Sequence, residues 1–335
     1  MLRSMYSGIS GLKANQIKLD VIGNNIANVG TTAFKTQRVR FQDMLSQNLR
    51  QATGPGTNQG GTNPSQVGLG TQVSGIDTTM SQGHLQPTGN DFDFLVDGNG
   101  YFVVGKGATG DDAGVTLGEN HSIETEGDDG EDGSFELSFT RDGSFTLDEY
   151  GQLVNSDGLR IMGYAIEGSE ITYDENGKPQ ISEAADVNSE ELKANEEKLV
   201  PLCIPDEIAG QKVKSFSVGR DGIIKASLAD NRTVAVGQIA MATFKNPAGL
   251  SKEGKNLNTA TANSGQPVFR SGIGAEENNN EKGFGNIVQG ALESANVDLA
   301  EQFTEMIVAS RAFQANGKII STGDEILQDL VNLKR

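Results

Sequence analysis

The 335-residue chain contains one cysteine, two histidines and no tryptophan, and only 6% of its residues are aromatic. One cysteine cannot form a disulfide within the chain, and with two histidines it cannot supply the ligands of an ordinary structural zinc site. No apolar run approaches the ~20 residues that cross a bilayer, and the N-terminus lacks the continuous apolar stretch of a cleavable secretory signal. We therefore expect no disulfide scaffold, no metal or cofactor site and no membrane insertion.

Charge and glycine are unevenly distributed along the chain. Forty-five acidic and 27 basic residues give a net charge of −18, which argues against nucleic acid or anionic membranes as partners. Residues 1–50 carry a net charge of +5, residues 296–335 carry −2, and residues 51–295 therefore carry −21. Glycine makes up about 13% of the chain against an average of about 7%, which favours a β-rich architecture with many turns.

Apolar residues at helical spacing mark both ends of the chain. The C-terminal row repeats every seven residues; Asn296 or Asp298 is placed to cap its helix, Glu301 lies in the first turn, and Lys334 and Arg335 suit the other end of the dipole. Neither helix can bury its stripe alone, so we expect the two to pair in a coiled-coil-like manner and to form an assembly surface. The expected assembly residues are Met5, Ile9, Leu12, Leu19, Ile22, Ile26, Leu299, Phe303, Met306, Phe313, Ile320, Leu327 and Val331.

Short apolar runs separated by turns fill the middle of the chain. Asp142-Gly143, Asp157-Gly158 and Asp221-Gly222 lie between or beside such runs, and Asp-Gly is a hairpin signal, so we expect antiparallel hairpins there. The Gly-rich stretch 51–75 indicates loop or extended chain. The predicted fold class is α+β, with long paired N- and C-terminal helices, a β-rich middle of antiparallel strands, and discontinuous domains. The expected domains are a terminal helical domain (1–34 and 296–335), connecting segments (35–75 and 265–295), a β-rich domain (76–166 and 199–264) with an acidic outer insertion (105–134), and a small outer insertion (167–198).

Several features invite a search for chemistry. The acidic stretch 126–133 offers carboxylates for Ca²⁺, but it lacks EF-hand spacing and is more simply a solvated loop. Residues 249–256 approach a phosphate-binding loop, but Asn256 replaces the Ser or Thr that would bind Mg²⁺, and no helical pattern follows. Neither His84 nor His121 has a nucleophile or a second histidine beside it. We therefore expect no enzyme; a nucleotide-binding enzyme and a secreted calcium-binding adhesin are the remote alternatives.

Ten short motifs, most of them near the chain ends, have sequences that are typical of a known protein family. They are Met5–Leu12, Leu19–Asn28, Thr32–Lys35, Gly83–Gly89, Gly237–Ile239, Asn246–Leu250, Ser294–Glu301, Met306–Ile307, Arg311–Asn316 and Leu330–Lys334. Together they resemble the flagellar rod and hook protein family, over residues 1–104, 135–164 and 201–335. The resemblance implies a structural subunit whose terminal helices pair and line the inner tube of a hollow helical homopolymer, with the β-rich domain stacked outside.

The resemblance also implies where such a subunit works. It would lie in the extracellular flagellum, reached unfolded through the flagellar type III export apparatus, which suits the absence of a cleavable signal. We expect the hook subunit, a curved tube acting as a flexible universal joint between rod and filament, because Arg3–Gly8 resembles hook proteins and residues 105–134 and 167–198 enlarge the outer body. The alternative is the distal rod subunit. The implied partners are further copies of the chain and the distal rod, hook cap and hook–filament junction proteins.

Cys203 lies in an apolar, strand-like run. The simpler interpretation is a buried, inert thiol. Some hook proteins resemble this chain in having one cysteine in this region, and the resemblance implies an intersubunit lysinoalanine cross-link. Its lysine candidates are Lys193 and Lys198, which are near only in sequence.

Overall fold

The computed structural model describes residues 2–56, 60–107, 114–118, 122, 136–169, 171–173, 179–181, 185–187, 192–275 and 283–333. The acidic stretch 126–133, His121, Lys334 and Arg335 lie outside the described residues. The chain divides into two compact units. Unit 1 comprises residues 1–30, 35–81 and 296–335, and unit 2 comprises residues 31–34 and 82–295. Each unit is described by itself. The prediction of a β-rich chain with one helix at each end is confirmed.

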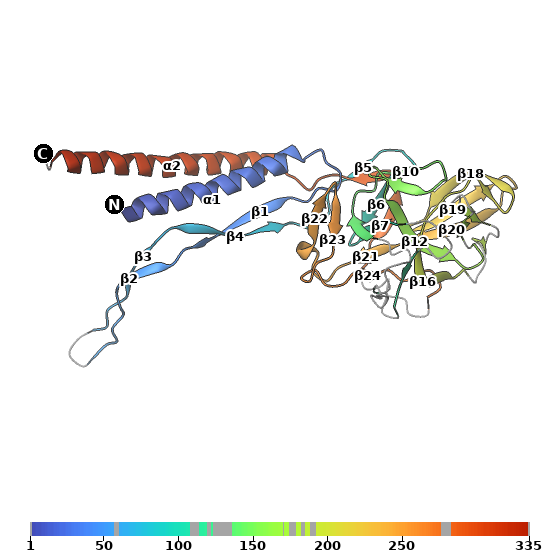
Figure 1. The fold of residues 1–335 in the computed structure, drawn as a ribbon, viewed down its shortest axis with the longest axis horizontal. Coiled ribbons are helices and arrows are strands. Elements are labelled where there is room, and N and C mark those ends of the chain that lie inside the picture. The colour runs from blue at the N-terminus through green and yellow to red at the C-terminus, as the bar shows by residue number, and fades with distance from the viewer. Residues whose placement is uncertain are drawn as a thin grey trace. The chain divides into compact units, whose positions relative to one another are not determined.

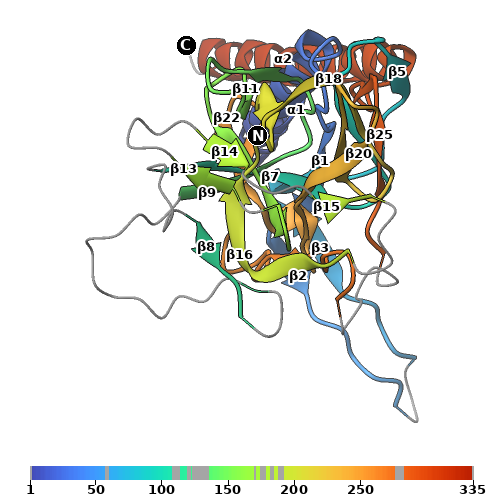
Figure 2. The same cartoon turned by 90° about the vertical axis from the view of Figure 1, so that its right-hand side faces the viewer.

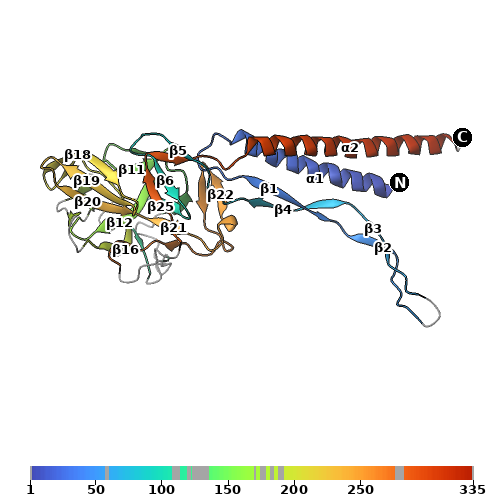
Figure 3. The ribbon, with the colours of Figure 1, turned by 180° about the vertical axis from the view of Figure 1, so that it is seen from behind.

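Unit 1 contains the two long helices. The first helix, α1 (Leu2–Ala27), has 26 residues, and the second, α2 (Leu299–Asn332), has 34. Asp298 caps α2, because its carboxylate accepts hydrogen bonds from the backbone N–H groups of Ala300 (2.8 Å) and Glu301 (3.3 Å). The helices lie side by side and run antiparallel, which the views from the front and from behind both show (Figure 1, Figure 3).

Two narrow antiparallel ribbons complete unit 1. Strand β1 (Gln37–Asp43) pairs with β4 (Thr71–Thr78), with a register shift between Arg40 and Phe41. Strand β2 (Ser46–Arg50) pairs with β3 (Ser65–Gly68). Part of the stretch 51–75 is therefore extended and paired. Local composition hides these strands, because their partners are more than a dozen residues away.

Unit 2 is almost entirely β-structure. Its elements are β5 (Leu85–Pro87), β6 (Phe94–Asp97), β7 (Tyr101–Lys106), β8 (Val115–Thr116), β9 (Glu136–Thr140), β10 (Phe145–Leu147), β11 (Leu153–Asn155), β12 (Arg160–Ile166), β13 (Ile171–Tyr173), β14 (Pro179–Ile181), β15 (Ala185–Asp186), β16 (Ala194–Pro201), β17 (Glu207–Ile208), β18 (Gln211–Val218), β19 (Ile223–Leu228), β20 (Thr233–Ile239), β21 (Met241–Thr243), the 3₁₀ turn η1 (Pro247–Gly249), β22 (Ser251–Gly254), β23 (Leu257–Thr259), β24 (Val268–Phe269), β25 (Asn286–Gln289) and β26 (Ala291–Glu293).

Strand β12 is the hub of the sheet network. It pairs antiparallel with β7, β11, β16 and β20. Smaller ladders extend the network, such as β13 with β14, which lie side by side in Figure 2. Two further antiparallel pairs, β5–β26 and β6–β25, join the incoming and outgoing ends of unit 2.

The hairpin signals met mixed outcomes. Asp221-Gly222 joins β18 to β19, where Val218 pairs with Ile224 and Gly222 has φ +80°, so this hairpin is confirmed. Asp157-Gly158 likewise connects the paired strands β11 and β12. The hairpin predicted at Asp142-Gly143 is wrong, because β9 pairs with β7 and β23 whereas β10 pairs with β11.

The backbone around Gly143 explains that error. Phe94 N–H donates to the Gly143 carbonyl at 2.9 Å, and a Cβ on Gly143 would overlap the Phe94 carbonyl oxygen. Glycine is therefore needed here for a close approach of two backbones, not for a two-residue hairpin turn.

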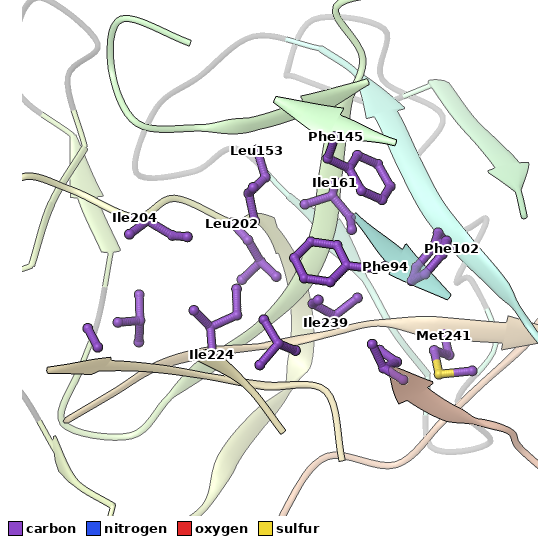
Figure 4. Packing of buried hydrophobic residues seen from close by; sticks show 14 of the residues in the cluster. Phe94, Phe102, Phe145, Leu153, Ile161, Leu202, Ile204, Ile224, Ile239 and Met241 are labelled. Atoms are coloured by element: carbon purple, nitrogen blue, oxygen red, sulfur yellow. The ribbon is translucent and has the colours of Figure 1, made fainter. Parts of the chain in front are cut away.

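A closely packed apolar core holds unit 2 together. Phenylalanines from β6, β7 and β10 meet aliphatic side chains from β12, β19 and β20 (Figure 4). Phe102 and Phe145 stack edge to face with ring centroids 5.5 Å apart. Burial of these apolar side chains is the main contribution to the stability of unit 2.

Candidate assembly interface

The contact between α1 and α2 is built from small and polar residues. A Cβ on Gly11 would lie 2.8 Å from Asn316 Nδ2, and one on Gly8 would lie 3.5 Å from Ile320 Cγ1. On the other helix, a Cβ on Gly323 would lie 3.2 Å from Met5 Cγ. Gly11 and Gly323 therefore leave room for Asn316 and Met5, whereas the space at Gly8 would admit a methyl group. The glycines cost intrinsic helix propensity.

Two polar links cross the same contact. Lys18 Nζ lies 3.3 Å from Glu305 Oε2, and Asn25 Nδ2 donates to Gln302 Oε1 at 3.0 Å. The ion pair is partly exposed, whereas the side chains of Asn25 and Gln302 are 1% and 9% exposed. Asn25 also bonds the backbone of Gln37 in both directions: Gln37 N–H donates to Asn25 Oδ1 at 3.0 Å, and Asn25 Nδ2 donates to the Gln37 carbonyl at 2.8 Å.

The predicted apolar heptad only partly coincides with this contact: Ile320 faces Gly8, whereas Leu299, Phe303 and Phe313 are exposed. The two buried residues of α2 are Gln302 and Ala309, and Asn316 and Gly323 continue their spacing of seven along the side that meets α1. The expected pairing of the two chain ends as a coiled-coil-like seam stays a prediction; the contact contains glycines and short polar side chains beside Met5 and Ile320. The predicted assembly residues divide into buried Ile22, half-buried Met5, Leu12, Leu19, Ile26, Met306, Ile320 and Leu327, and exposed Ile9, Leu299, Phe303, Phe313 and Val331.

Apolar side chains remain exposed on both flanks of α2. Val308, Ile319, Ile326 and Leu330 are between 45% and 59% exposed, and their spacing places them along one line of the helix. Leu299, Phe303 and Phe313 lie on the opposite flank. A helix that meets its partner along one narrow seam and is apolar on both flanks has surface for further helices.

Asn296 has a role that the sequence did not reveal. It was a candidate helix cap, but its side-chain oxygen accepts from Thr36 N–H at 2.7 Å, and its amide donates to the carbonyls of Thr79 (2.9 Å) and Ser81 (3.1 Å). The Lys35 ammonium donates to the same Ser81 carbonyl at 2.9 Å. These bonds join three distant segments of unit 1.

Cys203 is fully buried in unit 2. Its backbone forms an isolated antiparallel β-bridge with that of Gln152. Burial raises the pKa of the Cys203 thiol to about 12, with a smaller contribution from the negative charge of Asp148. Of the two lysine candidates, Lys193 is exposed and Lys198 is half-buried in β16. In the free subunit the thiol is thus protonated and shielded, and the lysinoalanine cross-link stays a prediction.

The segment that approaches a phosphate-binding loop is a hairpin. Lys255 and Asn256, with φ of +52° and +61°, form the two-residue turn between the paired strands β22 and β23. Lys255 Nζ lies 2.9 Å from Asp157 Oδ1. A phosphate-binding loop needs a strand before it and a helix after it, so this geometry does not fit one.

The remaining chemical candidates gain no partners in the described part of the chain. His84 is exposed. Within the described ranges, no three His, Cys, Asp or Glu side chains are grouped to hold a metal ion. A cavity of about 780 Å³ lies at β14, β17 and β18, and its described lining residues include Asp206, Glu207 and Lys212 but no serine, threonine, cysteine or histidine. Neither α1 nor α2, the helices of the described residues, has the length of apolar sequence that a bilayer crossing requires.

Three family descriptions match the chain. Residues 5–35 match the flagella basal body rod protein, residues 129–226 match the flagellar hook protein FlgE/F/G D1 domain, and residues 288–333 match the flagellar basal body rod FlgEFG protein C-terminal region. The first of these matches contains most of α1, and the last contains all of α2.

Full-length relatives agree with these matches. The chain is 40% identical over 335 residues to the flagellar basal-body rod protein FlgG of Bacillus subtilis, with 100% of both chains covered. It is 31% identical to the flagellar hook protein FlgE of Borreliella burgdorferi over 476 residues, and 31% identical to FlgG of the same organism over 338 residues, each with 100% of both chains covered. A solved structure, the flagellar hook protein FlgE2 of Helicobacter pylori, is similar over 62% of this chain and 100% of that chain, with a TM-score of 0.37 and 11% identity. The chain belongs to the flagellar rod and hook family of axial structural proteins.

Proposed function

We propose that this chain polymerises with copies of itself into a hollow helical tube. The exposed apolar flanks of α2 support this proposal, because an isolated subunit leaves them in water and neighbouring helices would cover them. In the tube, α1 and α2 pair in a coiled-coil-like manner and line the inner wall, and residues 82–295 form the outer layer. The division into the helical, connecting, β-rich and outer segments predicted from the sequence is part of the proposal.

Within the flagellar axis, we propose the hook as the segment that this chain builds. The observation that carries this placement is the charge of residues 82–295, which contain 36 acidic and 16 basic residues. Like charge disfavours tight, dry contacts between neighbouring outer bodies, and such bodies slide past one another across wet contacts. A curved, rotating joint needs this sliding, because its protofilaments lengthen and shorten while the helices stay joined. The 31% identity to a hook protein over the whole chain also supports the placement.

The basal-body rod is the second candidate, and sequence identity favours it. The rod protein of Bacillus subtilis is 40% identical to this chain. The alignment to the Borreliella hook protein runs over 476 positions, so that protein has at least 141 residues that this chain lacks. A straight, stiff segment would then be the product.

Electron cryo-microscopy of cells that lack the gene separates the two candidates. If the chain builds the hook, we expect basal bodies with a complete rod and neither hook nor filament, and complementation restores a curved tube. A truncated rod supports the second candidate instead. Cells that keep both rod and hook contradict the proposal of an axial tube.

The stiffness of the purified polymer tests the charge argument itself. The distance over which charges repel each other in solution, the Debye length, is about 10 Å at 0.1 M salt and about 3 Å at 1 M salt. We therefore expect the tube to bend less at high salt, when the acidic outer bodies pack more closely. A bending stiffness that is independent of salt contradicts the argument from charge and leaves the tube proposal intact.

The location and partners follow as part of the same proposal. The subunit is exported through the flagellar type III apparatus and works outside the cell, in contact with the distal rod, hook cap and hook–filament junction proteins. Cys203 forms lysinoalanine with Lys193 or Lys198 of a neighbour only if assembly exposes its thiol. Mass spectrometry of polymer boiled in detergent tests this, and a product that is entirely monomer with an intact thiol contradicts it.

A further inference from the structure

The two helices α1 and α2 could also pair in a second register, shifted by seven residues, that buries apolar side chains. In the observed register, Met5 meets Gly323 and Gly11 meets Asn316. If α2 slips by seven residues, Leu330 takes the place of Gly323 opposite Met5, and Gly323 takes the place of Asn316 opposite Gly11. Such a slip covers Leu330, which is 50% exposed in the observed register, and leaves two glycines facing each other. Apolar burial and small size therefore do not select the observed register.

The polar groups of the contact do discriminate between the two registers. In the slipped register, Ala309 replaces Gln302 opposite Asn25, and Ala312 replaces Glu305 opposite Lys18. Asn25 then loses an acceptor for one of its amide hydrogens at a buried position, which costs more than an exposed hydrogen bond. Lys18 loses its ion pair, a smaller effect because Lys18 and Glu305 are both partly exposed.

Asn25 cannot turn away to satisfy its amide elsewhere. Its oxygen and its nitrogen are both bonded to the backbone of Gln37, where β1 begins. These two bonds hold the amide in one orientation, so that its remaining hydrogen points to Gln302. A buried amide held in place by the backbone of a second segment is a rigid determinant of register.

We propose that the Asn25–Gln302 hydrogen bond, assisted by Lys18–Glu305 and by the Asn296 hydrogen bonds that anchor the start of α2, fixes the register in which the two chain ends pair within one subunit. The inference rests on the proposed tube, since each subunit of a helical polymer must present its helices at the same height. Asn25 and Gln302 act as positioning residues: they select the observed register over the one slipped by seven residues.

Disulfide trapping in the full-length chain tests the proposal. One reporter carries Met5→Cys with Gly323→Cys and reads the observed register; the other carries Met5→Cys with Leu330→Cys and reads the slipped one. In both, Gln302 is kept or replaced by Met, which has a similar length and no hydrogen-bonding group of comparable strength. We compare the yield of intramolecular disulfide in the first reporter with that in the second. We expect this ratio to fall about fivefold with Gln302→Met, which corresponds to the loss of one hydrogen bond.

Two controls keep the outcome specific. Gln314→Met makes the same change at an exposed position of α2 and should leave the ratio unchanged. Gln302→Glu keeps an acceptor oxygen opposite Asn25 and should restore most of the observed register. An unchanged ratio with Gln302→Met, an equal fall with Gln314→Met, or disulfides that form only between chains overturns the proposal. The trapping reads helix register whether the tube is a hook or a rod, so its failure is distinguishable from failure of the proposed function.

Discussion

Arg141 and Glu293 form a buried ion pair in unit 2, with Arg141 Nε 3.0 Å from Glu293 Oε2 and side chains that are 7% and 1% exposed. Arg141 also donates to the carbonyls of Val96 (3.2 Å) and Gly98 (2.7 Å), and Glu293 Oε1 accepts from Gly83 N–H at 2.8 Å. The pair therefore connects the end of β9 with β6 and β26, and its charges have several hydrogen-bond partners.

Removing one partner of this pair should destabilise unit 2 strongly. Arg141→Met leaves the Glu293 carboxylate buried without its counter-charge, so we expect a loss of about 3–5 kcal/mol in the free energy of unfolding. Urea unfolding followed by circular dichroism measures it. Arg232→Met, which breaks an exposed pair with Asp230, is the matched control and should not shift the unfolding midpoint measurably. Equal midpoints for the two variants would show that the buried pair adds nothing.

Gly143 should tolerate no side chain. A Cβ there overlaps the Phe94 carbonyl oxygen and breaks the adjoining backbone hydrogen bond, so we expect Gly143→Ala to cost at least about 2 kcal/mol. Gly219→Ala, whose added methyl would find its nearest neighbour at 3.8 Å, should change stability by less than about 0.5 kcal/mol. The same urea titration compares them. Similar values for both variants contradict the close approach at Gly143.

The buried thiol of Cys203 should make stability depend on alkaline pH. Its pKa is raised to about 12 from an ordinary value of 9.0, because burial disfavours the thiolate. The stabilisation is complete below pH 9 and is lost as the pH rises toward 12, because the unfolded thiol releases its proton first. We expect stability to fall between pH 9 and 11 by up to about 1.4 kcal/mol per pH unit more steeply than in Cys203→Ala. Parallel slopes in the two proteins contradict the buried, protonated thiol.

Gln152 should be replaceable by an apolar residue with a gain. Its side chain is 1% exposed, and neither its amide nitrogen nor its amide oxygen has a hydrogen-bond partner among the described residues. We expect Gln152→Leu to raise the free energy of unfolding by about 1 kcal/mol. Gln238→Leu is the control and should destabilise, because Gln238 donates to the Asp221 carbonyl at 2.9 Å and accepts from Ile273 N–H at 2.8 Å. A loss of stability with Gln152→Leu contradicts the prediction.

The features that the sequence predicted well are local ones. The period of the apolar residues located both terminal helices, and Asn296 and Asp298 were the two candidate caps of α2, of which Asp298 is the cap. The turn at Asp221-Gly222 was recognised because both of its strands are adjacent in the chain. In each case a few neighbouring residues determine the structure.

The features that were missed depend on distant segments. The similar tripeptides Arg141-Asp142-Gly143 and Arg220-Asp221-Gly222 lie in different surroundings, because the first packs against the backbone of Phe94. The heptad count favoured large apolar residues for the helix contact, whereas the observed contact also includes glycine, alanine and amides, and these small and polar positions were not predicted. Asn25 and Asn296 lie within motifs that resemble the flagellar rod and hook family, and this resemblance could have marked both residues as important.

The two strand pairs that close unit 2 have a consequence for how this family can vary. Strands β5 and β26 bring the two ends of the unit together, where Ser294 N–H donates to the His84 carbonyl at 2.9 Å and Gly83 N–H reaches Glu293. The chain therefore leaves the unit next to the point where it arrived. A segment whose ends meet can be enlarged, shortened, exchanged or circularly permuted without stretching the chain on either side. Residues 82–295 can therefore be exchanged as a unit, like an inserted domain.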